Sequence, residues 1–442
     1  MAEYAVYWLK IYLEREFSMN YSAMTKQELE ATYAKLQEEF AACKAKNLKL
    51  DMSRGKPAKN QIDLVSDILT VLQNPEDCIV DGVDTRNYGE LAGIRCAREY
   101  WADILDCKAE QVFIGGSASL NLMFDVIARA YSHGLLHSQR PWCKEETVKF
   151  LCPSPGYDRH FRITEFFGAE LITIPMTEEG PDMDLVEQMV KDPTVKGIWC
   201  VPKYSNPDGI IYSQKTVERF AALKPAAPDF AIMWDNAYCI HEFEGEYVPF
   251  PDIISLCEKA GNPDMAYEFA STSKITFAGG GISAMATSEA NIQYLSKLFF
   301  VNTISFDKVN QLRHVLYLKD KEHTIEIMKR HATVMAPKFQ TVLDMLDAQV
   351  APCGFARWNK PKGGYFVSLF TMKGTAKRAL ALCKEAGVVM TSAGATYPYG
   401  IDPDDSNIRI APSLPPVAEL QKAMEVFCVC LKLAAVEKLL NG

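Results

Sequence analysis

The segment Ile232-Met233-Trp234-Asp235-Asn236-Ala237-Tyr238 places a carboxylate directly after a short apolar run. The run, residues 230–234, is typical of a buried strand. A carboxylate at the end of such a strand is costly unless another group pairs with it. Asp235 is therefore expected either to cap a following helix or to face a positively charged partner.

Similar apolar runs alternate with longer helical patterns along the middle of the chain. Strands separated by helices indicate a mainly parallel sheet covered on both faces. At 442 residues the chain is too long for one simple core, so a second, smaller lobe is expected. The predicted strands are residues 111–114, 148–152, 171–174, 197–201, 230–234, 267–270 and 282–286.

The polar residues that suggest chemistry follow the ends of these strands. Asp235 ends one strand, Asn206 follows another, residues 115–117 follow a third, and Lys274 comes just after a fourth. Parallel α/β sheets bind ligands at the carboxyl ends of their strands. The sequence therefore predicts a ligand site at this edge of the sheet.

The motif Ser271-Thr272-Ser273-Lys274 supplies an amine flanked by hydroxyl groups. Such an amine can form a Schiff base with an aldehyde. Taken alone, Lys274 also fits a surface lysine at a strand-to-loop junction. Asp235 could keep a pyridine nitrogen protonated, and Tyr238 could donate to an oxygen on the same ring.

The turn Gly115-Gly116-Ser117-Ala118 precedes a predicted helix at residues 119–131. Free N–H groups at the start of a helix bind phosphate. Glycine-rich turns are also common without any ligand, and Asn206-Pro207-Asp208-Gly209 is equally compatible with a plain turn.

Taken together and in this order, these motifs resemble those of the fold-type I aminotransferases of the aspartate aminotransferase superfamily, from about Leu48 to the C-terminus. The resemblance implies an α/β fold, in which a large domain with a mainly parallel sheet binds pyridoxal 5′-phosphate and a smaller α+β domain flanks it. It also implies a two-step transamination, in which Lys274 holds the cofactor and then moves a proton between the substrate Cα and the cofactor. The cofactor contacts that it implies are Gly116, Ser117, Ala118, Ser271 and Ser273 at the phosphate, Tyr157 stacked on the ring, Asn206 and Tyr238 at the ring oxygen, Asp235 at the pyridine nitrogen, and Tyr88 from the neighbouring subunit of a homodimer.

The resemblance also implies substrate contacts. Gly55 is similar to the glycine beside the substrate carboxylate. Asn206 is expected to contact the substrate as well. Arg409, in Asn407-Ile408-Arg409-Ile410, is similar to the arginine that clamps the α-carboxylate. Residues 272–279, 307–314 and 407–413 resemble a bacterial subgroup of aspartate aminotransferases. The predicted substrates are therefore an amino acid, aspartate or glutamate, and a 2-oxo acid that accepts its amino group.

A dicarboxylate needs a second cation, which relatives place in a segment that corresponds to residues 299–303. That segment has no arginine here. Arg159, two residues beyond Tyr157, is the first candidate. Arg313 is the second candidate. It is at least as well explained as an exposed helix residue with no part in the site.

A second departure concerns the phosphate. Most relatives carry an arginine eight residues after the lysine, where this chain has Ile282. The sequence has no basic residue between Lys274 and Lys297, so hydroxyl groups, the helix terminus and Tyr88 are expected to bind the phosphate.

The net charge of −9 argues against a nucleic-acid partner. No apolar run approaches the ~20 residues of a membrane span. Thirteen scattered cysteines indicate reduced thiols in the cytoplasm, and no metal-binding spacing occurs. The expected division is a leader at residues 1–23, the N-terminal part of the small domain at 24–69, the large domain at 70–320 and the C-terminal small domain at 321–442.

Three alternatives remain open at this stage. One is a transaminase of aromatic or small neutral amino acids. Another is a β-lyase or decarboxylase on the same fold, since these enzymes differ in which Cα bond breaks. The last is a non-enzymatic sensor, although such proteins carry a DNA-binding domain before the fold and the short leader leaves no room for one.

Overall fold

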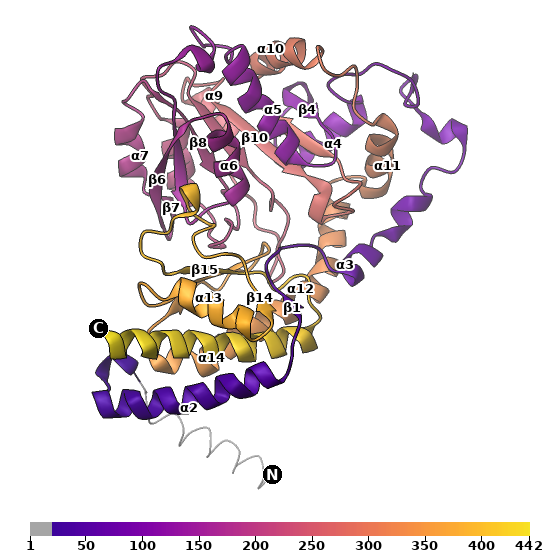
Figure 1. The fold of residues 1–442 in the computed structure, drawn as a ribbon. Helices are drawn as coiled ribbons and strands as arrows, with labels where there is room; N and C mark the ends of the chain where they lie inside the picture. The colour runs from indigo at the N-terminus through magenta and orange to yellow at the C-terminus, as the bar shows by residue number, and fades with distance from the viewer. Residues whose placement is uncertain (1–19) are drawn as a thin grey trace.

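The computed structural model describes residues 20–442, and an eight-stranded sheet forms the centre of its larger lobe (Figure 1). The strand order is β4-β11-β10-β9-β8-β5-β6-β7. The strands are β4 (Val112–Ile114), β5 (Lys149–Ser154), β6 (Glu170–Thr177), β7 (Gly180–Pro181), β8 (Val195–Cys200), β9 (Ala231–Asp235), β10 (Ala266–Ser271) and β11 (Ser283–Ala286).

Each predicted strand of the sheet is present. The pairs β6/β5, β5/β8, β8/β9 and β9/β10 are parallel, whereas β11 runs antiparallel to both β10 and β4. The short β7, which the sequence pattern did not predict, pairs antiparallel with β6. The prediction of a mainly parallel sheet is therefore confirmed.

Helices cover both faces of the sheet, so alternate strand residues enter different cores. In β9, Ile232 and Trp234 pack into one apolar cluster, while Ala231 and Met233 pack into the other. This period of two is the geometry of a strand buried on both faces. The helices of this lobe are α4 (Arg95–Leu105), α5 (Ser119–Ser132), α6 (Asp158–Phe166), α7 (Met183–Met189), α8 (Gln214–Ala221), α9 (Ile253–Lys259), α10 (Glu289–Phe299) and α11 (Lys308–Leu318).

The two ends of the described chain meet in the smaller lobe. Figure 1 shows α2 (Lys26–Ala45) lying along α14 (Val417–Asn441). Strand β1 (Leu50–Asp51) pairs with β14 (Val388–Val389) in parallel, and α13 (Ala376–Glu385) packs on α14. The remaining elements are α3 (Lys59–Asp63), β2 (Ile79–Val80), β3 (Val83–Asp84), α12 (Lys321–Gln349) and the three-stranded antiparallel sheet of β12 (Arg357–Trp358), β13 (Val367–Phe370) and β15 (Asn407–Ile410).

Helix α2 begins with a cap formed by its own side chains. The Thr25 hydroxyl accepts from the backbone N–H of Glu28 at 3.3 Å, and the Glu28 carboxylate accepts from the N–H of Thr25 at 2.7 Å, which completes a capping box. The leader predicted at residues 1–23 falls mostly outside the described residues. Tyr21, at its end, is buried and stacks on Phe355 with ring centres 5.5 Å apart.

Across residues 20–442, no helix is both long enough and apolar enough to cross a membrane.

Candidate active site

A cavity of about 680 Å³ lies at the carboxyl ends of β8, β9 and β10, at the edge that the sequence predicted. It is lined by side chains from both lobes. The predicted site residues on it are Ala118, Tyr157, Arg159, Asn206, Asp235, Tyr238, Ser271, Ser273 and Lys274 from the larger lobe, and Gly55 and Arg409 from the smaller one.

Lys274 ends a 3-10 turn, Thr272–Lys274, that follows β10 directly. Its Nζ lies 4.9 Å from the ring centre of Tyr238 and 5.7 Å from that of Tyr365. Burial lowers the pKa of the Lys274 amine, and the carboxylate of Asp235 opposes this shift. A lowered pKa enlarges the neutral, nucleophilic fraction of the amine near neutral pH.

Asp235 is the last residue of β9 and is buried. Its Oδ2 lies 2.9 Å from Nε2 of His160, whereas its Oδ1 is buried without a hydrogen-bond partner. The helix-cap alternative is wrong, because the next helix begins only at Ile253. Asp235 is therefore a paired carboxylate with one oxygen left for a further donor.

Two aromatic side chains flank this carboxylate. Tyr157 immediately precedes α6, and its ring lies edge-on to His160 with centres 4.9 Å apart. Burial raises the pKa of Tyr157 to about 12. It also raises the pKa of Tyr238 well above its usual range, so both hydroxyls stay protonated and can donate.

The turn that joins β4 to α5 lies against the lysine motif. The Ser273 hydroxyl donates to the Ser117 carbonyl at 3.1 Å, and the Ser271 hydroxyl donates to Ser273 at 3.0 Å. Helix α5 begins after Ala118 without a side-chain cap. Because uncapped N–H groups point out of a helix start, this end of the cavity is suited to an anion.

Arg409 projects from β15 and is buried. Its Nη1 donates to Asp158 at 3.0 Å and to the Asn206 side-chain oxygen at 3.3 Å, while its Nε has no partner. The guanidinium lies 4.9 Å from the ring centre of Phe366. A Cβ at Gly55 would come within 2.5 Å of that ring, so a larger residue there would force the ring to move.

Two exposed arginines mark the mouth of the cavity. Arg159 also borders a neighbouring hollow of about 510 Å³ beside Phe124 and Phe166. Arg54 lines the same mouth, and the sequence analysis did not identify it.

The cavity of a single chain does not include every predicted residue. Tyr88 is 81% exposed in the loop between β3 and α4. Gly116, Ser117 and Arg313 are likewise absent from the lining, and Arg313 projects from α11. Ile282 is buried in the apolar core, and its backbone N–H donates to the Thr272 hydroxyl at 2.9 Å.

Sequence reasoning missed several residues of the site. His160 stacks on Trp199 with ring centres 4.5 Å apart and holds Asp235 from the side. His160 follows Tyr157 by three residues at the start of a helix, and residues three apart on a helix lie on the same face. This spacing could have predicted that His160 lies beside Tyr157. Phe366 and Asp158 gave no such clue, because the folded chain alone brings them to Arg409.

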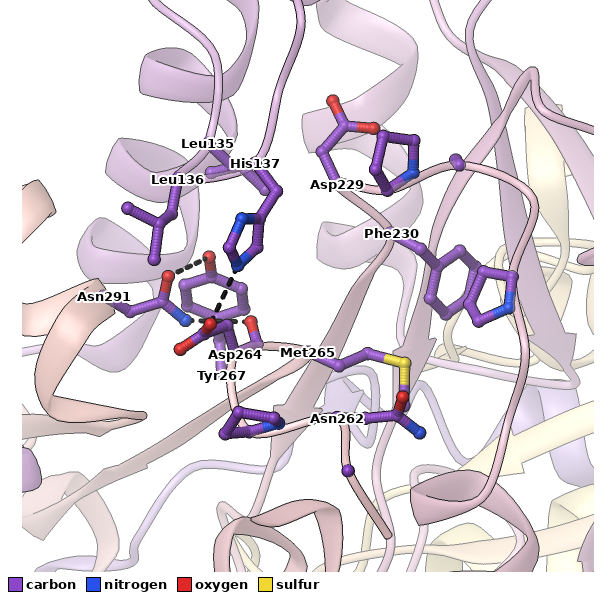
Figure 2. A pocket seen from close by; sticks show the side chains of 15 residues that line it. Leu135, Leu136, His137, Asp229, Phe230, Asn262, Asp264, Met265, Tyr267 and Asn291 are labelled. Carbon is purple, nitrogen blue, oxygen red and sulfur yellow. Dashed lines mark hydrogen bonds and ion pairs between the residues drawn. The ribbon is translucent and has the colours of Figure 1, made fainter.

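A second cavity, of about 260 Å³, lies at the opposite, amino ends of β9 and β10 (Figure 2). Its polar groups pair with one another: His137 with Asp264 at 2.8 Å, and the Tyr267 hydroxyl with Asn291 at 3.1 Å. Among the described residues that line it, none has a buried polar side-chain atom without a partner. The chemistry therefore concentrates in the larger cavity.

Comparison with known proteins agrees with this geometry. The profile of the aspartate amino-transferase family matches residues 24–442. The chain belongs to this family. It is 48% identical over 406 residues to the aspartate aminotransferase of Corynebacterium glutamicum, which covers 92% of this chain and 94% of that protein.

Solved structures give the same assignment. A crystal structure of an aspartate transaminase from Corynebacterium glutamicum superposes with a TM-score of 0.92 at 47% identity, covering 93% of this chain and 97% of that one. An α-aminoadipate aminotransferase from Thermus thermophilus, complexed with N-(5′-phosphopyridoxyl)-L-leucine, shares the fold with a TM-score of 0.71 at 20% identity, covering 92% and 98%. The chain is a fold-type I aminotransferase, a transferase of amino groups.

Asp235→Asn is expected to lower kcat/KM for transamination by about 30- to 5,000-fold, the cost of removing one partner of a buried charge pair. A neutral amide removes the negative charge that Asp235 presents to His160 and to the Lys274 amine. Steady-state kinetics with a thermal melt would separate lost chemistry from lost folding. Unchanged activity in the folded variant would reduce Asp235 to a structural residue.

Proposed function

We propose that this aminotransferase uses pyridoxal 5′-phosphate, with Lys274 as the residue that binds it covalently. The observation that carries the proposal is the unpartnered Oδ1 of Asp235, which is buried in the same cavity as the Lys274 amine. A protonated pyridine nitrogen fits an orphaned carboxylate oxygen, because it supplies both a hydrogen bond and a positive charge. When bound, the cofactor supplies an aldehyde and an electron-withdrawing ring.

In this proposal the cavity residues hold the ring from several sides. Tyr157 packs on its face, and Asn206 and Tyr238 donate to its oxygen. The protonated state of Tyr238 supports the last role, since only the neutral hydroxyl donates. His160 positions Asp235 by holding its other oxygen at 2.9 Å.

Gly116, Ser117, Ala118, Ser271 and Ser273 bind the phosphate in this proposal. The support is the uncapped start of α5 together with the hydroxyl chain that runs from Ser271 through Ser273 to the Ser117 carbonyl.

Lys274 also carries the proton in the proposed reaction. Once an amino acid has displaced it, its amine removes the proton from the substrate Cα and returns a proton in the reverse half-reaction. The lowered pKa supports this role, because a general base works best when its pKa lies near the working pH.

We further propose a dicarboxylic substrate, aspartate or glutamate, paired with a 2-oxo acid. Arg409 takes the α-carboxylate beside Gly55 and Asn206. Arg159 takes the distal carboxylate, and Arg54 adds positive charge at the same mouth. The support is the local excess of arginine, together with the similarity to an aspartate aminotransferase.

The working unit in this proposal is a homodimer in which Tyr88 reaches the neighbouring subunit's phosphate. The support is its 81% exposure, which leaves the side chain free to contact a second subunit, and its absence from the cavity of its own chain. Lys308 holds the loop in place by donating to the carbonyl of Gly89 at 3.0 Å.

Borohydride treatment of the yellow holoenzyme is expected to fix the cofactor on Lys274, as peptide mass mapping would show. Lys274→Ala should lose the covalent link and the proton transfer, the latter worth about 10²–10⁴ in rate. Lys297→Ala, at an exposed position of α10, is the matched control. Near-wild-type turnover of Lys274→Ala would overturn the proposal.

Arg159→Ala is expected to lower kcat/KM for aspartate by about 30- to 5,000-fold while sparing alanine, because alanine has no distal carboxylate. Parallel kinetics with aspartate, alanine and phenylalanine would measure this. A wild-type preference for alanine or phenylalanine would contradict the dicarboxylate assignment. An equal loss for all donors would contradict only the role of Arg159.

Tyr88→Phe is expected to weaken cofactor retention by about 0.5–1.5 kcal/mol, or up to about 3 if the acceptor is charged, for one lost hydrogen bond. Equilibrium dialysis of both proteins would measure the difference, and sedimentation would give the oligomeric state. A fully active monomer at nanomolar concentration would contradict the shared site.

A further inference from the structure

The proposed phosphate end of the cavity lacks an obvious positive charge. A phosphate monoester carries about −1.5 to −2 charge at neutral pH. The turn at residues 115–118 and the serines beside it supply only neutral donors. Ile282 occupies the position of the arginine that relatives use, and it is buried in the core.

Arg313 lies next to this region. It projects from α11, and its Nη2 is 4.0 Å from the point that a Cβ of Gly280 would occupy. Its Nη2 also donates to the side-chain oxygen of Asn310. Asn310 in turn donates to the carbonyls of Gly280 at 3.1 Å and Gly281 at 2.9 Å, so the arginine is fixed against the glycine loop that follows Lys274.

The same glycine loop touches the proposed phosphate turn. A Cβ at Gly281 would lie 3.3 Å from the Ser117 carbonyl, which is the group that accepts from Ser273. Phe306, just before α11, comes within 3.9 Å of the corresponding point at Gly116. The glycine loop therefore lies against the turn through Gly281 and against Arg313 through Gly280.

The guanidinium of Arg313 has unused binding capacity. Its Nε is buried without a hydrogen-bond partner. Among residues 20–442, no carboxylate forms an ion pair with Arg313 within 4.0 Å. A buried charged donor without a partner is destabilising, and an anion bound beside Arg313 would remove that cost.

We propose that Arg313 supplies the positive charge for the cofactor's phosphate, in place of an arginine at position 282. The inference rests on the proposed use of pyridoxal 5′-phosphate. It also separates the two arginine candidates for the distal carboxylate: Arg159 lines the cavity with Arg409, whereas Arg313 lies beside Gly280 of the glycine loop.

The test compares two ligands that differ only in the phosphate. Affinities of the apoenzyme for pyridoxal 5′-phosphate and for pyridoxal are measured by quenching of tryptophan fluorescence, without any turnover. Arg313→Gln is expected to weaken binding of the phosphorylated ligand about ten- to hundredfold and to leave pyridoxal unchanged. Arg313→Lys should recover part of the loss, because it keeps the charge without the planar fork.

Arg330→Gln is the matched control: it removes an exposed arginine of α12 that does not line the cavity, so it should leave the ratio of the two affinities unchanged. Inorganic phosphate supplies a second measurement, since it should raise the melting temperature of the wild-type apoenzyme more than that of Arg313→Gln. Equal weakening of both ligands, or no weakening of either, would overturn the role of Arg313. Failure of the wild type to bind the phosphorylated ligand at all would instead overturn the proposed function.

Discussion

The parallel pairing of β9 with β10 is the constraint on which the active site depends. Phe269 lies opposite Asp235 in this register, and the backbone N–H of Asn236 donates to the Phe269 carbonyl at 2.8 Å. Because neighbouring strands lie about 4.8 Å apart, the pairing holds the buried carboxylate close to the turn that carries Lys274. A shift by one residue would turn Asp235 to the other face of the sheet.

As a result, the ionisable side chains of Asp235 and Lys274 are buried near each other. The groups around them limit the free-energy cost of removing them from water. His160 takes one oxygen of Asp235, and Trp199 stacks on His160 to fix its ring. Lys274 lies beside the rings of Tyr238 and Tyr365, where burial lowers its pKa. Burial enlarges the neutral fraction of the Lys274 amine, which the covalent role proposed for that lysine requires.

The smaller lobe completes the site across the interface between the lobes. Arg409 comes from β15, yet its Nη1 is held by Asp158 and Asn206 of the larger lobe. The contact between Gly55 and Phe366 similarly joins two distant segments of the smaller lobe. A carboxylate that binds Arg409, as we propose for the substrate, therefore meets a guanidinium already oriented by both lobes, so less side-chain freedom is lost on binding.

The sequence by itself determined the strands, the edge of the sheet where chemistry gathers, and the lysine, aspartate and arginine that line the cavity. These depend on local patterns, namely apolar runs, strand ends and short motifs, which the fold preserves. Only the tertiary structure showed that Asp235 is held by His160 rather than capping a helix, and that Phe366 and Asp158 surround Arg409. It alone brought Arg313 to the glycine loop, since a helix residue 39 positions after Lys274 reaches that loop through packing that no local pattern encodes.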